Sequence, residues 1–207
     1  MRDHRQTNPI RPLGAADADA LMSGGALAEL VGLAGADLPG IIAGLARSKI
    51  TVAAAESLTG GLLTAVLTEV PGASAVVRGG VVVYATDLKH SLAGVDAGLL
   101  AARGPVDPDV ALELARGVRL ACGAKVGLGL TGVAGPDSQN GVAVGTWYVA
   151  VTGNTQSKVV SHRPDQRSWD GAPAPSGPPS RGEVRNAAVR AAVRLLAELV
   201  ESVGSRR

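Results

Sequence analysis

Residues 51–61, Thr-Val-Ala-Ala-Ala-Glu-Ser-Leu-Thr-Gly-Gly, decide how this chain folds. A short apolar run ends in a carboxylate, two hydroxyls and two glycines, and an apolar helical pattern then resumes. This order predicts a sharp strand-to-helix turn that holds Ser57 out of the core. Thr59 is placed to cap the helix, and Gly60 and Gly61 let a ligand approach bare backbone N–H groups. The same pattern fits an ordinary capped helix start, so the rest of the chain must discriminate between the two.

The composition favours one domain of helices layered on a sheet. Apolar residues make up 46% of the 207 residues, with no Phe and only two Trp and two Tyr, so the core packs small side chains closely. A net charge of +2 is too small to indicate a nucleic-acid partner. No stretch reaches the roughly 18 continuous apolar residues of a membrane span, and the N-terminus carries no apolar signal segment. We therefore expect a cytoplasmic protein with neither nucleic acid nor membrane as a partner.

Helical and strand patterns alternate along the chain. Helical spacing covers residues 26–33, 37–47, 62–68, 86–92, 109–122 and 183–203, and strand patterns cover 50–55, 75–84, 125–131, 144–152 and 157–161. Asp37 and Asp107 are placed to cap two of the helices. The β-branched run 75–84 is typical of a buried strand. This alternation predicts an α/β layered domain.

Side-chain patterns give expectations for individual positions. The helix at 109–122 should bury Val110, Leu114, Val118 and Ala121, and the last helix should turn Val189, Val193, Leu196 and Val200 inward and its arginines outward. Cys122 lies in the apolar phase of a helix, where a buried reduced thiol is expected rather than a catalytic one.

The two ends and one internal segment differ from the rest in composition. We expect residues 1–24 to form a flexible extension, 25–204 the domain, and 205–207 a tail. Within the domain, residues 163–180 hold five of the twelve prolines, and only Trp169 is strongly apolar. Such a segment cannot bury enough apolar surface to offset its ordering entropy, so we predict a disordered insertion there.

Several familiar catalytic and nucleotide-binding motifs are absent. The chain has no Walker A loop and no His-Glu-x-x-His, and Ser57 does not stand in Gly-x-Ser-x-Gly. Residues 127–132, Gly-Leu-Gly-Leu-Thr-Gly, match the dinucleotide pattern Gly-x-Gly-x-x-Gly. They lie inside a predicted strand that runs into a Pro-Asp loop rather than a helix, which argues against a dinucleotide site.

A Ser57 nucleophile would need a base other than histidine. The only histidines are His4, His90 and His162, and none is well placed for a Ser–His–Asp triad. A lysine amine whose pKa is lowered by burial can take a serine proton instead. Lys89 follows the strand at 75–84, at the end where an open α/β sheet keeps its ligand crevice. Tyr84 could relay a proton or orient the amine; the alternative is that Lys89 is a solvated surface lysine.

A third cluster, Thr131-Gly-Val-Ala-Gly-Pro-Asp137, also follows a predicted strand. A Thr hydroxyl, glycine N–H groups and one carboxylate suit a ligand with phosphate or ribose, although a tight Gly-Pro-Asp turn gives the same pattern. Together, the two strand-end loops favour a phosphate-bearing substrate.

In this order, the clusters resemble the family of the competence-damage-inducible protein's C-terminal domain, the nicotinamide-nucleotide amidohydrolases. The resemblance covers about residues 37–203. It rests on residues 55–61, 78–80, 84–89, 92–95, 131–137, 144–148 and 181–185. It implies an α/β fold with a three-layer α/β/α single domain and a mixed sheet. It also implies a homodimer or higher homo-oligomer that deamidates nicotinamide mononucleotide to nicotinic acid mononucleotide and ammonia without a metal or other cofactor.

Carried over by motif, the resemblance implies that Ser57 is the nucleophile, Lys89 its base and Tyr84 an assisting hydroxyl. The substrate-binding residues that it implies are Glu56, Thr59, Gly60, Gly61, Thr86, Thr131, Gly132, Gly135, Asp137, Arg181 and Arg185. The two arginines would meet phosphate or complete the pocket across subunits.

Two positions depart from the family pattern. Leu58 and Thr86 stand where the family often has Cys and Asn. A catalytically weak or inactive nucleotide-binding or regulatory member is therefore the alternative. A third reading, a partner module in DNA uptake or repair, rests on the family's name alone.

Overall fold

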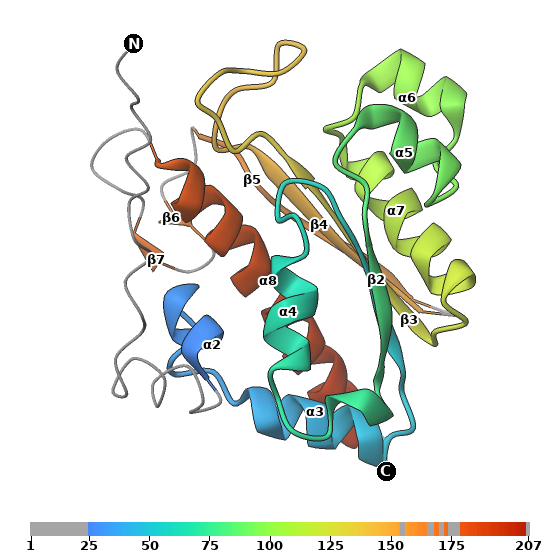
Figure 1. The fold of residues 1–207 in the computed structure, drawn as a ribbon, viewed down its shortest axis with the longest axis vertical. Helices are drawn as coiled ribbons and strands as arrows, with labels where there is room; N and C mark the ends of the chain where they lie inside the picture. The colour runs from blue at the N-terminus through green and yellow to red at the C-terminus, as the bar shows by residue number, and fades with distance from the viewer. Residues whose placement is uncertain (1–24, 154–155, 165–167, 170–171, 174–178, 206–207) are drawn as a thin grey trace, which may run out of the picture.

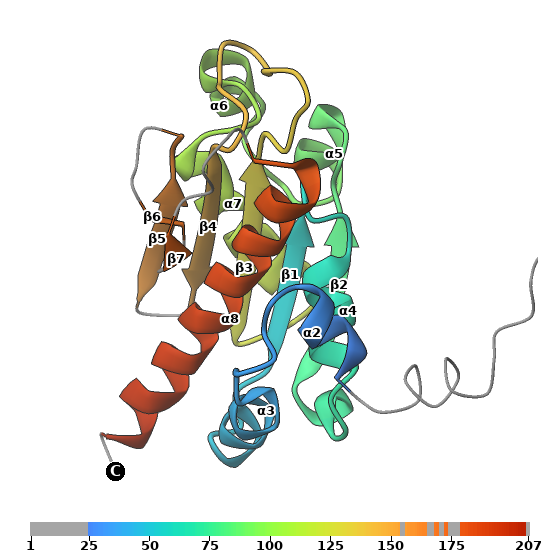
Figure 2. The ribbon, with the colours of Figure 1, turned by 90° about the vertical axis from the view of Figure 1, so that its left-hand side faces the viewer.

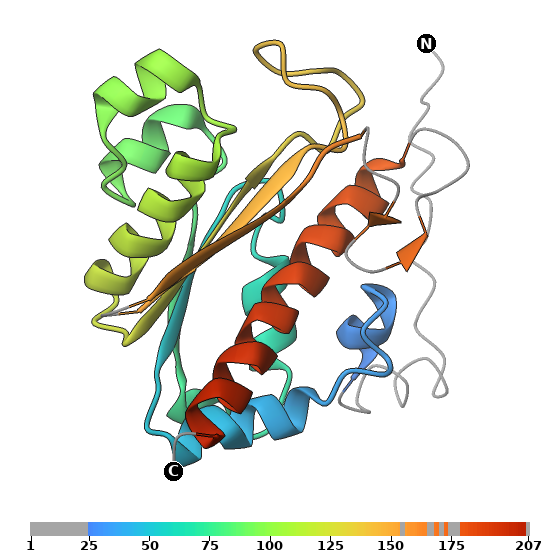
Figure 3. The same cartoon turned by 180° about the vertical axis from the view of Figure 1, so that it is seen from behind.

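Helices cover both faces of a five-stranded sheet (Figure 1). The computed structural model describes residues 25–153, 156–164, 168–169, 172–173 and 179–205. Helices α5, α6 and α7 lie on one face of the sheet, and α2, α3, α4 and α8 lie on the other, as the reverse view also shows (Figure 3). The predicted three-layer α/β/α domain is confirmed.

The sheet is mixed, with strand order β2-β1-β3-β4-β5 (Figure 2). Its strands are β1 Val52–Glu56, β2 Val77–Val82, β3 Val126–Gly132, β4 Trp147–Thr152 and β5 Ser157–His162. Strand β1 pairs in parallel with both β2 and β3, whereas β3–β4 and β4–β5 are antiparallel. The carboxyl ends of β2, β1 and β3 therefore meet at one edge of the sheet, where the three clusters of candidate residues begin.

The predicted helices and two of their caps are confirmed. The helices are α2 Ala26–Leu30, α3 Leu38–Arg47, α4 Leu62–Thr68, α5 Thr86–Ser91, α6 Ala97–Arg103, α7 Pro108–Ala121 and α8 Arg181–Gly204, with a 3₁₀ turn at Ala73–Ala75. The Asp37 carboxylate accepts from the Gly40 N–H at 2.8 Å, and that of Asp107 accepts from the Asp109 N–H at 2.8 Å. Helix α6 was not predicted, because it is short and buries none of its residues, which leaves little apolar periodicity.

The central strand β1 packs on both helical layers with very small side chains. Val52 and Ala54 belong to the core cluster formed with α3, α4 and α8, and Ala53 and Ala55 belong to the cluster formed with α7. On β3, a Cβ added to Gly129 would lie 2.1 Å from the Ala111 carbonyl oxygen of α7. Gly127 and Gly129, two of the three glycines that match the dinucleotide pattern, thus let helix α7 approach the sheet.

Strand β2 corrects one expectation about burial. The run at 75–84 was predicted to be a buried strand, but β2 lies at the sheet edge, and its residues alternate between half-buried and exposed. Val82 is 46% exposed. An edge strand has a neighbour on one side only, so a β-branched run is compatible with a half-exposed position.

Two expectations about α7 and its end are also wrong. Val110, Leu114 and Val118 are buried as predicted, but Ala121 is exposed. Cys122 is the C-cap and is half-buried rather than buried. Both residues lie where the helix ends and leaves the sheet, so the helical period no longer sets which side faces the core.

The C-terminal helix begins two residues earlier than predicted, at Arg181. Val189, Val193 and Leu196 are buried, while Val200 is half-buried. The arginines do not all point outward: Arg190 donates to the Val31 carbonyl oxygen at 2.8 Å.

Several predictions fall on residues outside the description. The predicted flexible extension, 1–24, lies outside it, as do the last two residues. Within the predicted disordered insertion, two short strands pair with each other, β6 Ser168–Trp169 and β7 Ala172–Pro173, and residues 165–167, 170–171 and 174–178 are not described. None of the helices in the described residues is long and apolar enough to cross a membrane.

Candidate active site

Ser57 and Lys89 meet in a buried contact at the carboxyl end of β1. Ser57 directly follows the strand, and its N–H donates to the Leu130 carbonyl oxygen of β3 at 3.0 Å. Lys89 reaches in from α5 with 1% of its surface exposed, so it is not a solvated surface lysine. Its Nζ lies 3.0 Å from Ser57 Oγ and 2.9 Å from the Val83 carbonyl oxygen. The Ser57 hydroxyl and the Lys89 amine are therefore in direct hydrogen-bond contact.

Burial changes the acidity of this amine. Desolvation lowers the pKa of Lys89 to about 8, against an opposing effect from the Asp87 carboxylate. About one molecule in ten then carries a neutral amine at pH 7, and about half do at pH 8. An amine with this pKa can both take a proton from a hydroxyl and return it at neutral pH.

Glu56, not Thr59, caps helix α4. One Glu56 carboxylate oxygen accepts from the Gly61 and Leu63 N–H groups at 3.1 and 3.0 Å, and the other accepts from the Thr64 N–H and hydroxyl at 2.8 and 2.6 Å. The carboxylate is almost fully buried and satisfies the first N–H groups of the helix. Thr59, which was predicted to be the cap, has a buried hydroxyl with no hydrogen-bond partner among the described residues.

Contrary to the prediction, the N–H groups of Gly60 and Gly61 are not available to a ligand. The Gly60 N–H donates to the Ser57 carbonyl oxygen at 3.1 Å, and the Gly61 N–H donates to Glu56. Within the described residues, no hydrogen bond is assigned to the N–H groups of Leu58 and Thr59. The backbone donors that remain available at this turn are thus the N–H groups of the two residues that follow Ser57.

A cavity of about 320 Å³ opens beside the Ser57–Lys89 contact. The predicted residues that line it are Ser57, Tyr84, Lys89, Thr131, Gly132, Gly135, Asp137 and Arg181. The predicted residues that are not part of its lining are Glu56, Thr59, Gly60, Gly61, Thr86 and Arg185. Val133, Ala134 and Pro136, which belong to the predicted loop 131–137, also line it, and the lining residues that the sequence did not reveal are Leu58, Pro105, Val106 and Gln139.

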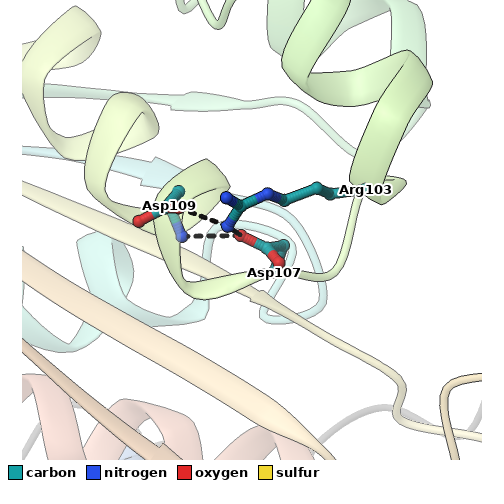
Figure 4. Close-up of polar contacts among 3 residues, drawn as sticks. All are labelled: Arg103, Asp107 and Asp109. Atoms are coloured by element: carbon teal, nitrogen blue, oxygen red, sulfur yellow. Dashed lines mark hydrogen bonds and ion pairs between the residues drawn. The ribbon is translucent and has the colours of Figure 1, made fainter.

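The missed residues Pro105 and Val106 come from the turn between α6 and α7. The Thr131 hydroxyl donates to the Pro105 carbonyl oxygen at 2.7 Å, so this hydroxyl joins two walls of the cavity. Arg103 forms ion pairs with Asp107 and Asp109 and so closes the same turn from outside (Figure 4). Pro105 and Pro108, which flank Val106 and the Asp107 cap, were the available signal that this turn has a fixed shape.

Arg181 spans the mouth of the cavity. Its Nη2 donates to the Tyr84 hydroxyl at 2.8 Å, and its Nη1 donates to the Gly135 carbonyl oxygen at 2.7 Å. The Tyr84 hydroxyl therefore contacts Arg181, and it is the Tyr84 backbone carbonyl oxygen, 3.4 Å from Nζ, that approaches Lys89. Tyr84 thus links Lys89 to Arg181 at the cavity mouth.

The two remaining predicted residues lie away from the cavity. Thr86 is exposed at the first position of α5. Arg185 is half-buried, and its guanidinium donates to the carbonyl oxygens of Leu58 and Thr59 at 3.1 and 2.9 Å. Among the described residues, no three His, Cys, Asp or Glu side chains are grouped as metal ligands.

Comparisons with known proteins identify the family. Residues 39–200 match the family model described as the CinA C-terminal domain. A "CinA-like protein" of Frankia casuarinae is 52% identical over 122 residues, which are 58% of this chain and 28% of that protein. A "putative competence-damage inducible protein" of a Geobacillus species is 50% identical over 108 residues, 52% of this chain and 26% of its own length. The chain thus spans less than a third of the length of either relative.

Solved structures match over most of the chain. The competence/damage inducible protein CihA of Agrobacterium tumefaciens is 32% identical with a TM-score of 0.67, and the match covers 84% of this chain and 94% of that one. A CinA superfamily protein of Klebsiella pneumoniae is 26% identical with a TM-score of 0.69, covering 80% and 97%. With a family model that spans residues 39–200 and these shared folds, the chain belongs to the CinA C-terminal domain family.

Proposed function

We propose that the protein hydrolyses the carboxamide of nicotinamide mononucleotide, giving nicotinic acid mononucleotide and ammonia. The observation that carries this proposal is the buried contact of 3.0 Å between Lys89 Nζ and Ser57 Oγ beside an open cavity. An amide is a poor electrophile, so it needs a strong nucleophile and a group that returns a proton to the departing nitrogen. A lysine whose pKa is about 8 can make Ser57 a strong nucleophile by taking its proton, and can then return that proton to the leaving nitrogen.

In the first half of the reaction, the neutral Lys89 amine takes the Ser57 proton while Oγ bonds to the carboxamide carbon. The carbonyl electron pair moves onto oxygen and forms an oxyanion. When this pair returns, the carbon–nitrogen bond breaks, and the Lys89 ammonium gives its proton to the leaving nitrogen, which departs as ammonia. Water then attacks the Ser57 ester with Lys89 again as base, which releases the carboxylic acid and the free serine.

The oxyanion needs hydrogen-bond donors close to the nucleophile. The Leu58 and Thr59 N–H groups follow Ser57 directly and have no assigned acceptor in the described part of the chain. We assign the oxyanion to these donors in place of Gly60 and Gly61, whose N–H groups are already used. Such donors typically contribute about 10²–10³ in kcat.

The far side of the cavity suits the rest of a nucleotide. Arg181 brings a guanidinium to the mouth, where it can meet a phosphate, and Asp137 brings a carboxylate that can accept from ribose hydroxyls. Thr131, which lines the cavity, also holds this side in place because its hydroxyl donates to the Pro105 carbonyl oxygen.

The test is release of ammonia from nicotinamide mononucleotide by the wild-type protein and by Ser57→Ala. We expect release by the wild type and at least about a 10³-fold lower rate in the variant, because the nucleophile is lost. Ser91→Ala is the matched control: it removes an exposed hydroxyl at the end of α5, outside the cavity lining, and should keep the wild-type rate. Unchanged release by Ser57→Ala would contradict the mechanism. Binding of the nucleotide without ammonia release would instead identify a nucleotide-binding member of the family.

A further inference from the structure

Arg185 holds the turn that follows Ser57, although it was expected to contact substrate. It projects from α8, on the other side of the sheet from Lys89, and does not line the cavity. Its Nε donates to the Leu58 carbonyl oxygen at 3.1 Å, and its Nη2 donates to the Thr59 carbonyl oxygen at 2.9 Å. A planar cation thus binds two consecutive peptide groups of the nucleophile turn.

These two bonds fix where the unassigned N–H groups point. In a trans peptide, the C=O and the following N–H lie in one plane and face opposite ways. By binding the Leu58 carbonyl, Arg185 therefore directs the Thr59 N–H away from α8. The positive charge also polarises this peptide, which makes its N–H a stronger donor.

The second bond acts on Leu58 through one more peptide group. The Thr59 carbonyl shares its peptide with the Gly60 N–H, which donates to the Ser57 carbonyl oxygen at 3.1 Å. The Ser57 carbonyl in turn shares its peptide with the Leu58 N–H. Arg185 thus fixes both candidate oxyanion donors, one directly and one through Gly60.

We propose that Arg185 is a positioning residue that orients the Leu58 and Thr59 N–H groups toward the oxyanion of the reaction. This inference rests on the proposed hydrolysis at Ser57. Because an oxyanion exists only along the reaction path, loss of this positioning lowers kcat and leaves substrate binding almost unchanged. If Arg185 contacted the substrate phosphate, its loss would instead raise KM.

Arg190 provides a matched control on the same helix. It lies five residues further along α8 and also donates to a backbone carbonyl oxygen, that of Val31 at 2.8 Å, but at the α2 end of the layer rather than at the site. Truncation of either arginine removes an anchoring contact of α8. Only truncation of Arg185 releases the turn after Ser57.

The experiment compares Arg185→Met, Arg185→Lys and Arg190→Met in nicotinamide mononucleotide turnover. We expect Arg185→Met to lower kcat about 100-fold with KM within about threefold, as for loss of one oxyanion donor. Arg185→Lys keeps the charge but loses the planar guanidinium that binds both carbonyls, so it should recover part of kcat, whereas Arg190→Met should keep the wild-type kcat. A rise in KM at constant kcat in Arg185→Met would overturn the proposal, as would an equal loss of kcat in Arg190→Met.

A second readout separates this proposal from the proposed substrate. A fluorophosphonate probe reacts with an activated serine: the Oγ–P bond forms, the P–F bond breaks, fluoride leaves and Lys89 takes the proton. The labelling rate at Ser57, followed by intact mass, should fall in Arg185→Met and not in Arg190→Met, because the phosphonyl oxygen uses the same donors. A labelled wild type that does not hydrolyse the nucleotide would refute only the substrate. Equal labelling of Arg185→Met and wild type, or an unlabelled wild type, would refute the role of Arg185.

Discussion

Two loops at the same edge of the sheet are built from similar residues but are held very differently. The turn after β1, residues 57–61, is fixed by Lys89 from one helical layer and Arg185 from the other, with Glu56 beneath it. The loop after β3, residues 132–137, buries Val133 and Ala134 and then reaches the surface, and the described side-chain hydrogen bond to it comes from Arg181 to Gly135. The turn that carries the proposed nucleophile is thus held by side chains from both helical layers, whereas the loop that forms the opposite cavity wall is held by one of them.

The largest expected effect on turnover follows from removing the Lys89 amine, the proposed base, beside the turn at residues 57–61. Lys89→Met keeps the length of the side chain and removes the amine, so we expect turnover to fall by about 10³-fold or more. In the wild type, kcat/KM should rise with pH up to about 8, because only the neutral amine of the free enzyme accepts the Ser57 proton. Lys125→Met, a change at an exposed lysine, is the control. A pH profile that is flat between 6 and 9 would count against Lys89 as the base.

Glu56 tests whether the constrained turn also supports the fold. Glu56→Gln replaces one carboxylate oxygen with a donor that faces N–H groups already pointing at it, so we expect the free energy of unfolding to fall by about 3 kcal/mol. The corresponding change in the other loop, Asp137→Asn, lies at an exposed position and should stay within about 0.5 kcal/mol. Chemical denaturation measures both. Equal effects in the two variants would remove the distinction between the loops.

Variants of Arg181 test whether the loop after β3 and the cavity mouth contribute to substrate binding. Arg181→Met should raise KM about tenfold and leave the stability of the protein near that of the wild type, because the side chain is exposed at the cavity mouth. Tyr84→Phe should raise KM less, since Arg181 keeps its bond to Gly135. Because the two residues share a hydrogen bond, the double variant should be no worse than Arg181→Met alone. A loss of kcat in Tyr84→Phe would instead identify its hydroxyl as a proton relay.

The same amine also makes stability depend on pH. Below pH 8, Lys89 is protonated in both the folded and the unfolded chain, and the folded state bears the full cost of a buried charge. Between pH 8 and about 10.5, the unfolded chain binds more protons than the folded one, so the stability of the wild type should rise relative to Lys89→Met. Denaturation midpoints of both proteins across this range provide the measurement. A difference that does not change with pH would mean that the pKa of Lys89 is not lowered.

Thr59 gives the smallest expected effect. Its hydroxyl is fully buried without a partner among the described residues, so Thr59→Val keeps the shape and removes an unsatisfied group. We expect unchanged activity and a free energy of unfolding that is equal or up to about 1 kcal/mol higher. Thr146→Val is a comparison at another buried threonine. Destabilisation by more than 1 kcal/mol would show that the Thr59 hydroxyl has a role that this geometry does not explain.

The sequence was informative where a local pattern sets the structure. The strand-to-turn pattern at Ser57 and the position of Lys89 after the next strand placed both residues at the same end of the sheet. A solvated surface lysine has the same local pattern, so the pairing of the two also needed the family resemblance. The caps at Asp37 and Asp107 are equally local, because each carboxylate binds an N–H within three residues.

The errors concern contacts that only the three-dimensional fold creates. Glu56 reaches eight residues ahead to Thr64, so the nearer Thr59 was taken as the cap. Arg185 lies 127 residues from Leu58, and helical periodicity alone placed it facing solvent. The burial of β2 depends on which strands flank it, and β-branched residues do not report that order. Pro105 and Val106 line the cavity because the α6–α7 turn meets β3 in space.

The position of Ser57 between the two helical layers has a consequence for folding in the cell. Lys89 comes from the layer of α5 and Arg185 from that of α8, and these layers contact the sheet from opposite faces (Figure 1). A chain with only one layer docked would leave Ser57 with an ordinary, unreactive hydroxyl. In the proposed mechanism, only completely folded molecules would then have a reactive Ser57. A nascent or damaged chain would not react at this serine.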